Sequence, residues 1–157
     1  MSSFVKQVYT KSINMDITHN LHIKANPEKI YLAVTTKNGI SGWWSKDCSV
    51  GESEGKNSLL KFDKQGTLVE MGFITLELVP HEKAVWECIS MPNPAWIGTT
   101  IHTEIRESAN GCDVVFSHRD FDQKWQGQEP FEQTKATWNH FMDSLVSFCE
   151  KGKGQPW

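Results

Sequence analysis

Clusters of basic residues are missing from this sequence. Its 16 Lys and Arg are scattered among 19 Asp and Glu, and the formal net charge at pH 7 is -3. Proteins that bind nucleic acid neutralise phosphates with a basic stripe or patch. We therefore expect no nucleic-acid partner.

Long apolar runs are missing as well. No segment approaches the ~20 consecutive apolar residues that span a bilayer. Residues 1–11 contain Lys and Gln among only a few apolar residues, unlike the apolar core of a secretory signal peptide. These features predict a cytoplasmic protein without a membrane partner.

Cysteine and histidine are few, and their spacing does not suggest metal ligation. His19 and His22 are three residues apart, which on a strand places them on opposite faces, so local geometry does not let them share one metal. The four cysteines contain no CxxC pair. They are expected to be reduced, mostly buried thiols: Cys48, Cys88, Cys112 and Cys149. We expect no metal and no cofactor.

Candidate catalytic residues are equally scarce. Residues 51–57 superficially resemble a phosphate loop, but their glycines are one residue too close and Asn57 replaces the required Ser or Thr. We interpret this segment as a turn between strands. His118 could form an acid–base pair with Asp120 or His140 only if the fold brought them together, and an inward, hydrogen-bonded histidine is the favoured interpretation. No residue is assigned a catalytic role.

Tryptophan, by contrast, is abundant. The chain of 157 residues has seven tryptophans within an otherwise ordinary 38% hydrophobic composition. Its length is typical of one domain. Because large indoles are hard to bury except in a thick core or a cavity wall, the composition favours a roomy interior.

The beginning of the chain predicts a strand followed by a short helix. Apolar and polar residues alternate over residues 13–24, as in a half-buried strand. Asn26 then supplies a helix cap and Pro27 the first helical position. We expect this helix to run to about Thr36 and to be stopped by Asn38–Gly39.

Residues 46–118 predict an antiparallel meander. Short apolar segments are separated by turn signals, and no helix-length segment intervenes, so neighbouring strands are joined by hairpins. Alternation predicts four inner faces: Ile74, Leu76 and Leu78; Ala84, Trp86 and Cys88; Ile101, Thr103 and Ile105; Val114, Phe116 and His118.

The last part of the chain predicts one long amphipathic helix over residues 129–150, ended by Gly152. Its apolar stripe follows helical spacing: Phe131, Thr134, Trp138, Phe141, Met142, Leu145 and Phe148. We interpret this stripe as a core face, part of which borders a ligand space.

Several short sequence motifs, which occur in the same order as in a known protein family, then suggest a resemblance. They are ANPEKIY at residues 25–31 with Ala33, Trp43–Trp44, WIGT at residues 96–99, residues 111–118, Trp138 with Phe141, and EKGKGQP at residues 150–156. Over nearly the whole chain, they resemble the START-like (SRPBCC) superfamily, in particular its activator of Hsp90 ATPase homologue 1-like branch.

The resemblance implies an α+β helix-grip fold in a single domain over residues 1–157. In it, a curved antiparallel sheet of about six or seven strands wraps around a long C-terminal helix, with two short helices after the first strand. Many relatives hold a hydrophobic small molecule between sheet and helix, whereas others bind a chaperone or act as cyclases, and the fold does not choose among these roles.

We therefore expect a hydrophobic small-molecule ligand in a pocket with His118 as its polar anchor. The expected lining residues are Trp86, Ile101, Phe116, His118, Trp138, Phe141 and Met142. A co-chaperone-like module that binds Hsp90 is the alternative, and an enzyme of the cyclase or hydratase type is a third hypothesis.

Overall fold

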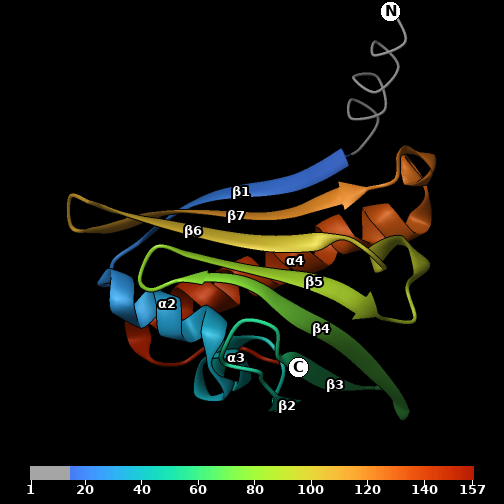
Figure 1. The fold of residues 1–157 in the computed structure, drawn as a ribbon, viewed down its shortest axis with the longest axis horizontal. Helices are drawn as coiled ribbons and strands as arrows, with labels where there is room; N and C mark the ends of the chain where they lie inside the picture. The colour runs from blue at the N-terminus through green and yellow to red at the C-terminus, as the bar shows by residue number, and fades with distance from the viewer. Residues whose placement is uncertain (1–14) are drawn as a thin grey trace, which may run out of the picture.

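The computed structural model describes residues 15–157, which form one curved sheet and a long helix laid across it (Figure 1). The elements in chain order are β1 (Met15–Ile23), α2 (Pro27–Thr35), α3 (Lys37–Trp43), β2 (Asp47–Ser49), β3 (Asn57–Lys64), β4 (Thr67–Val79), β5 (Lys83–Ser90), η1 (Pro94–Trp96), β6 (Thr100–Ser108), β7 (Gly111–Phe121), η2 (Gln123–Trp125) and α4 (Glu129–Lys151).

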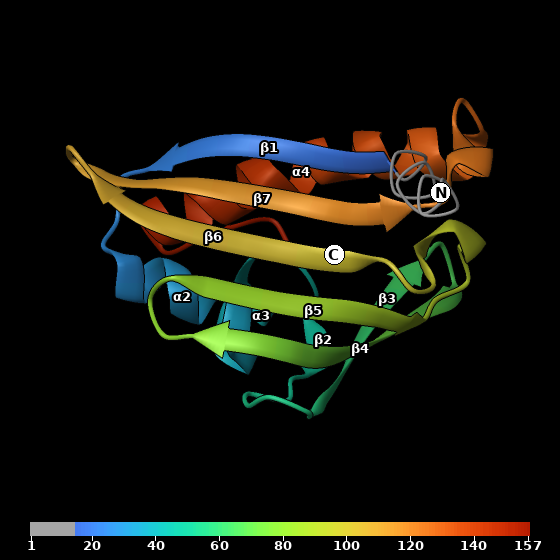
Figure 2. The same cartoon turned by 45° about the horizontal axis from the view of Figure 1, so that its top comes forward.

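All seven strands belong to one antiparallel sheet with the order β1-β7-β6-β5-β4-β3-β2. From β2 to β7 each strand pairs with the next in sequence, as the predicted hairpins require. β1 closes the other edge by pairing with β7. Helix α4 covers one face of the sheet behind β1, β7 and β6 (Figure 2). Helices α2 and α3 lie beside the C-terminal half of α4. This is the predicted α+β helix-grip arrangement.

The cap at the start of α2 forms as predicted. The side chain of Asn26 accepts a hydrogen bond from the backbone N–H of Lys29 at 2.8 Å, and Pro27 is the first helical residue. The preceding strand begins at Met15 in the described residues, so the expected strand residues Ile13 and Asn14 lie outside them.

The predicted stop at Asn38–Gly39 is wrong. Thr36 is the C-terminal cap of α2 and also the N-terminal cap of α3, because its hydroxyl accepts a hydrogen bond from the N–H of Gly39 at 3.0 Å. Helix α3 therefore begins at the next residue and includes Asn38 and Gly39. A Cβ on Gly39 would lie 2.2 Å from the carbonyl oxygen of Leu32 and 2.5 Å from Cα of Ala33. The glycine is needed because the two helices touch there.

Three of the four predicted inner faces are confirmed, on β5, β6 and β7. The face predicted for β4 is wrong. The side chains buried on β4 are those of Met71, Phe73 and Thr75, whereas Leu76 is 44% exposed. Apolar residues occupy both sides of β4, and the register shifts between Thr75 and Glu77, so alternation alone could not identify the inner side.

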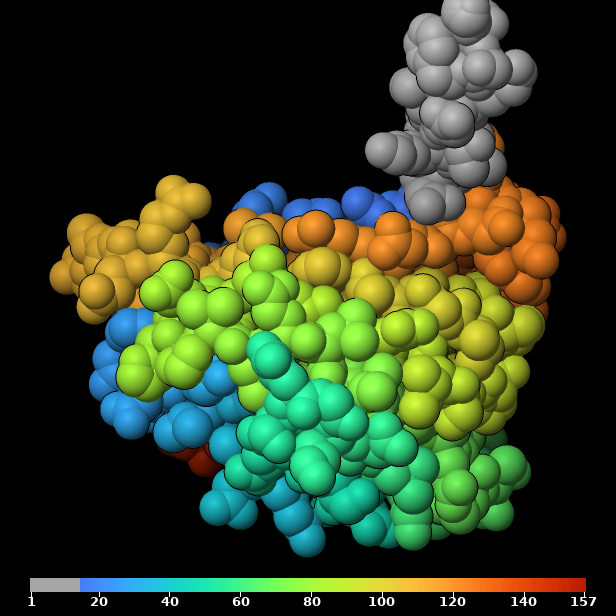
Figure 3. Space-filling view, in the orientation of Figure 1, coloured from blue at the N-terminus to red at the C-terminus, as the bar shows by residue number. Residues whose placement is uncertain are grey.

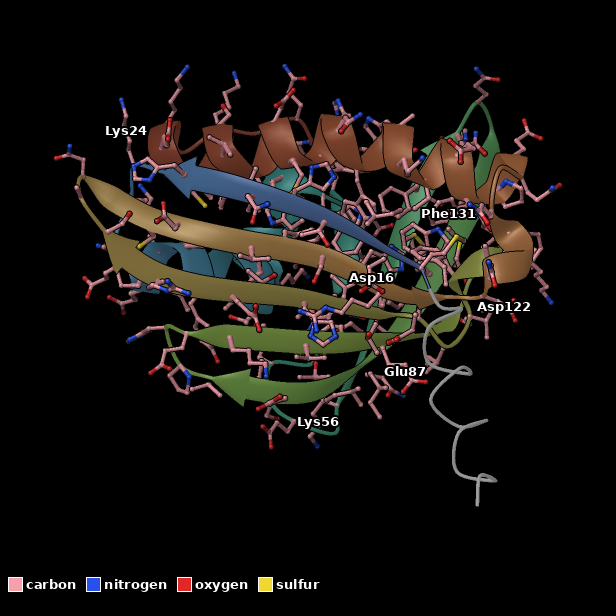
Figure 4. The ribbon with its side chains drawn as sticks, turned by 90° about the horizontal axis from the view of Figure 1, so that it is seen from above. Asp16, Lys24, Lys56, Glu87, Asp122 and Phe131 are labelled. Atoms are coloured by element: carbon pink, nitrogen blue, oxygen red, sulfur yellow. The ribbon has the colours of Figure 1, made fainter. Side chains whose placement is uncertain are left out.

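Helix α4 confirms the predicted amphipathic helix. It ends at Gly152, whose φ of 78° is left-handed and whose N–H donates to the carbonyl of Phe148 at 2.9 Å. The stripe faces the sheet, with Phe131 between the helix and the strand ends in Figure 4. Its buried members are Phe131, Thr134, Trp138, Phe141, Met142 and Leu145. Within residues 15–157, no helix is long and apolar enough to cross a membrane.

Candidate functional site

The space between sheet and helix is filled mainly by aromatic side chains. Trp44 follows α3, and its ring centroid lies 5.4 Å from that of Trp43, 6.3 Å from that of Trp86 and 5.3 Å from that of Trp138. Trp43 is anchored in turn, because its indole N–H donates to the carbonyl of Ala33 at 2.7 Å. These four indoles are 4% exposed or less, and they form the centre of the core.

His118, on β7, is completely buried beside this aromatic group. The indole N–H of Trp138 lies 3.0 Å from His118 Nδ1, and the Oγ1 atom of Thr99 lies 2.7 Å from His118 Nε2. An indole N–H can only donate, so Nδ1 accepts and the ring hydrogen of the neutral histidine is on Nε2. The Thr99 hydroxyl then donates to the carbonyl of Trp96.

Burial lowers the pKa of His118 to about 3. The ring is therefore neutral at physiological pH, and both of its nitrogens are engaged with protein groups. Neither Asp120 nor His140 hydrogen-bonds to it, because Asp120 accepts from the Thr100 hydroxyl and His140 contacts the carbonyl of Gln155. The histidine ties β7 to α4 and to the β5–β6 loop.

A groove of about 430 Å³ opens at the end of the molecule where the β3–β4 turn, the β5–β6 loop and the N-terminal half of α4 meet, at the right in Figure 1. Four tryptophans are among its walls. Its lining residues are Trp44, Phe62, Asp63, Lys64, Gln65, Val69, Met71, Met91, Pro92, Asn93, Trp96, Gln133, Thr134, Thr137, Trp138, Phe141 and Trp157.

Three inner polar groups of the groove, those of Trp96, Thr134 and Trp138, are already hydrogen-bonded within the protein. The indole N–H of Trp96 donates to the Thr134 hydroxyl at 2.8 Å, which donates to the carbonyl of Pro130 at 2.7 Å. The indole N–H of Trp138 is used by His118. Among the lining side chains of residues 15–157, Asp63 and Lys64 are the ionisable ones, and both are exposed, so the floor is apolar and charge is confined to the rim.

The segment after α4 supplies one wall of this groove. It turns back along the helix, where the N–H of Gln155 donates to Ser144 Oγ at 2.7 Å. It ends with Trp157, whose ring centroid lies 5.2 Å from that of His140 and 4.7 Å from that of Phe141. The Trp157 side chain remains 48% exposed, so an aromatic face stands at the mouth of the groove.

A second, much smaller cavity of about 20 Å³ lies deeper between sheet and helices, with room for about one water. Trp44 borders both spaces. The lining of the small cavity consists of Val34, Ile40, Trp43, Trp44, Ala84, Trp86, Ile101, Thr103 and Phe116.

The structure distributes the expected pocket residues over different places. Trp138 and Phe141 line the groove, while the small cavity is lined by Trp86, Ile101 and Phe116. His118 and Met142 are buried and border neither space.

Sequence reasoning did not assign Trp44, Trp96 or Trp157 to the pocket. Trp96 lies two residues after the Pro92–Pro94 turn signal, and an indole beside a predicted loop is the one local cue that could have indicated a cavity mouth. Nothing local to Trp44 or Trp157 distinguishes a groove wall from a core position.

A third hollow, of about 460 Å³, lies toward the outer face of the sheet around β6, β7 and the β4–β5 turn. Several of its walls are charged, including Glu82, Lys83, Glu104, Arg106 and Asp113. Elsewhere on this side, the side chains of β4 to β7 form a continuous layer in Figure 3. The apolar groove is therefore the better candidate for a binding site.

Residues 51–55, GESEG, fit the GxSxG spacing of a hydrolase nucleophile elbow, but their setting differs. Such an elbow joins a strand to a helix, whereas this exposed turn joins β2 to β3. Glu52 accepts the N–H of Lys37 at 3.0 Å, and Glu54 accepts that of Leu78 at 2.9 Å. The segment fastens the edge of the sheet to α3 and β4, in agreement with the predicted turn.

Among residues 15–157, no group of three or more His, Cys, Asp or Glu is placed to hold a metal.

Comparison with known proteins gives a consistent result. The family model described as "Activator of Hsp90 ATPase homolog 1-like protein" matches residues 24–150. The solution structure of the Aha1 dimer from Colwellia psychrerythraea is 32% identical and has a TM-score of 0.72, with 89% of this chain and 99% of that chain covered.

Two further structures share the fold at lower identity. A protein from Staphylococcus saprophyticus is 20% identical, with a TM-score of 0.70 over 90% of this chain and 96% of that chain. A protein from Chromobacterium violaceum is 17% identical, with a TM-score of 0.69 over 86% and 96%. The comparison with curated protein sequences gave no match.

Proposed function

This chain belongs to the activator of Hsp90 ATPase homolog 1-like family, and we propose that it binds a small, largely apolar molecule in the groove between the β3–β4 turn, the β5–β6 loop and α4. The observation that carries the proposal is the groove itself. Its volume of about 430 Å³ and its aromatic floor are typical of small-molecule sites.

The hydrogen bonds around the floor define which part of a ligand enters. Trp96, Thr134 and Trp138 have already paired their inner polar atoms, so a polar group inserted beside these three side chains would lose its water without gaining their hydrogen bonds. An apolar body suits the floor, and a polar group suits the rim, where Lys64 and Gln65 are exposed.

This proposal keeps two residues of the pocket expected from sequence, Trp138 and Phe141, and adds Trp44, Trp96 and Trp157. His118 serves the site indirectly. It holds the Trp138 indole and, through Thr99, the loop that carries Trp96.

Thermal unfolding with and without ligand tests the proposal. At a free concentration of ~100 times its dissociation constant, a ligand selective for the native state adds about 2.7 kcal/mol. For a domain of this size, that corresponds to a rise in Tm of roughly 5 to 10 °C. The probes are anilinonaphthalene sulfonate, flavonoids, sterols and short fatty acids, and native mass spectrometry of the purified protein looks for a co-purified molecule.

A matched pair of variants locates the binding. Thr137→Trp places an indole in the groove, whereas Ala136→Trp places one on the exposed side of the same helix. We expect Thr137→Trp to abolish the shift in Tm and Ala136→Trp to keep it. The proposal fails if no probe shifts Tm, or if both variants still bind equally well.

A second candidate function is interaction with an Hsp90-type chaperone. It is favoured by the family description and by the 32% identity to a protein described as Aha1. A pull-down with the chaperone from the same cells tests it directly. Recovery of Hsp90 by wild type and by Thr137→Trp alike would separate this function from occupation of the groove.

Catalysis of the cyclase or hydratase type has less support. A pocket that moves protons needs a positioned acid or base. In the groove these could only be Asp63 and Lys64, which lie exposed at the rim.

A further inference from the structure

We infer that Trp44 sets the depth of the groove and thereby restricts the ligand to compact amphiphiles, with a short chain or one or two rings, in place of long acyl chains. This inference rests on the proposed function and concerns the selectivity of the same site. It starts from the position of Trp44, the one tryptophan that borders both the groove and the small inner cavity.

The Trp44 ring is held on several sides. Trp86 stacks against it at an interplanar angle of 25° and a centroid distance of 6.3 Å, and Phe73 lies 5.6 Å away. Trp43 and Trp138 occupy other sides at 5.4 Å and 5.3 Å. With 3% of its surface exposed and aromatic rings packed on its other sides, this side chain cannot move away from the groove to admit a longer ligand.

The main chain of Trp44 is fixed too. Its N–H donates to the carbonyl of Ile40 at 2.9 Å, and its own carbonyl accepts the N–H of Trp157 at 3.0 Å. The indole is therefore a rigid partition between the groove and the interior.

Behind this partition lies a cavity bordered by three of the seven residues that the sequence analysis expected around the ligand. The inner cavity of about 20 Å³ is lined by Trp86, Ile101 and Phe116, with Thr103 as its one polar residue. Removing the Trp44 indole would join it to the groove and create one continuous apolar channel under the sheet. The native side chain keeps a ligand outside this channel.

A series of n-alkyl carboxylates from hexanoate to hexadecanoate, below their critical micelle concentrations, tests this inference. Each methylene that is buried strengthens binding by up to about fourfold. For the wild type, the affinity should rise with chain length and then level off once the groove is filled. For Trp44→Ala, the affinity should keep rising to a longer chain length before it levels off. The longest carboxylates should bind this variant at least tenfold more tightly than they bind the wild type.

Trp43→Ala is the matched control. It removes the same indole from the same core, but Trp43 borders only the inner cavity and leaves the partition in place. Its chain-length profile should follow the wild type. If Trp44→Ala does not fold, Trp44→Leu provides the test, with a smaller displacement in the same direction.

The outcomes separate this inference from the proposed function. If the wild type binds neither a carboxylate nor anilinonaphthalene sulfonate, the proposed function fails. If the wild type gains affinity all the way to hexadecanoate, Trp44 is no partition, although the groove remains a binding site. The inference also fails if the folded Trp44 variant levels off at the wild-type length, or if Trp43→Ala is displaced equally.

Discussion

The backbone N–H of Trp157 donates a hydrogen bond to the carbonyl oxygen of Trp44 at 3.0 Å, although the two residues are 113 positions apart in the sequence (157 − 44), and both side chains line one groove. The Lys46 N–H donates to the carbonyl of Trp157 at 3.0 Å and completes the pairing. These two backbone hydrogen bonds thus hold Trp44, the inner partition of the groove, next to Trp157, its outer aromatic wall. A change in either segment is expected to affect the other wall.

Trp157→Ala should weaken ligand binding more than it weakens the fold. The side chain is 48% exposed, so we expect a loss of no more than about 1 kcal/mol in the free energy of unfolding. Loss of one aromatic wall should reduce the affinity for anilinonaphthalene sulfonate by about 3- to 10-fold. Fluorescence titration measures it, and Trp125→Ala, outside the groove, is the control. Equal affinities for the two variants would remove Trp157 from the site.

Trp138→Ala should cost about 3 to 5 kcal/mol in urea unfolding, because a large buried aromatic leaves a cavity. Trp138→Phe keeps most of the ring but leaves His118 Nδ1 without its donor, and it should cost about 1 to 3 kcal/mol. A loss below ~1 kcal/mol for the alanine variant would show that α4 does not grip the sheet at this position.

His118 should make stability fall as the pH falls. Its pKa is about 3 in the folded protein, against 6.5 as the ordinary value. Between these values the unfolded chain binds a proton that the folded chain does not, so the free energy of unfolding decreases by about 1.4 kcal/mol per pH unit below pH ~6.5. The stabilisation is fully present above that pH.

His118→Gln removes this contribution. Burial also lowers the pKa values of His19 and His102, but both remain in wild type and variant, so the difference between the two curves isolates His118. Urea unfolding from pH 7.5 to 4.5 should give a steeper decline for wild type. Parallel curves would mean that His118 takes up its proton equally in the folded and unfolded states, and they would contradict a lowered pKa.

Gly39→Ala should destabilise the protein even though alanine favours helices by about 1 kcal/mol over glycine. The added Cβ would meet the backbone of Leu32 and Ala33 at 2.2 to 2.6 Å, and backbone atoms cannot give way as a side chain tip does. We expect a net loss of about 1 to 3 kcal/mol or more. Asn38→Ala, at an exposed position of the same helix, is the control and should be close to neutral. A stabilised Gly39→Ala protein would show that α2 and α3 are not in close contact.

The long helix and most of the strands could be predicted because their signals are local. Seven positions at helical spacing, six of them apolar, and a glycine after them suffice to identify α4, and Asn26–Pro27 marks the start of α2. Where both faces of a strand are apolar, as in β4, the local signal vanishes and the choice of Phe73 over Ile74 depends on the rest of the core.

The pocket is the part that local signals describe least. The alternation of apolar and polar residues correctly predicted that Trp86, Ile101 and Phe116 face the helix. It does not distinguish an inward residue that borders a cavity from one that packs against another side chain. The ring of Trp44, the residue after α3, packs against Trp86, while Trp43 and Trp138 pack against Phe116, and all of these contacts depend on long-range packing.

The sequence by itself determined the antiparallel meander, the amphipathic side of α4 and the abundance of aromatic rings, since periodicity, capping residues and composition are properties of short stretches of chain; the helix-grip arrangement followed from the family resemblance. Only the tertiary structure decided that the interior under β5 and β6 is nearly solid and that the open space lies at the end near Trp96 and Trp157. The physical reason is close packing. Whether a space stays open depends on the shapes of rings brought together from α3, β5, the β5–β6 loop, α4 and the segment after it, and no single stretch of sequence contains that sum.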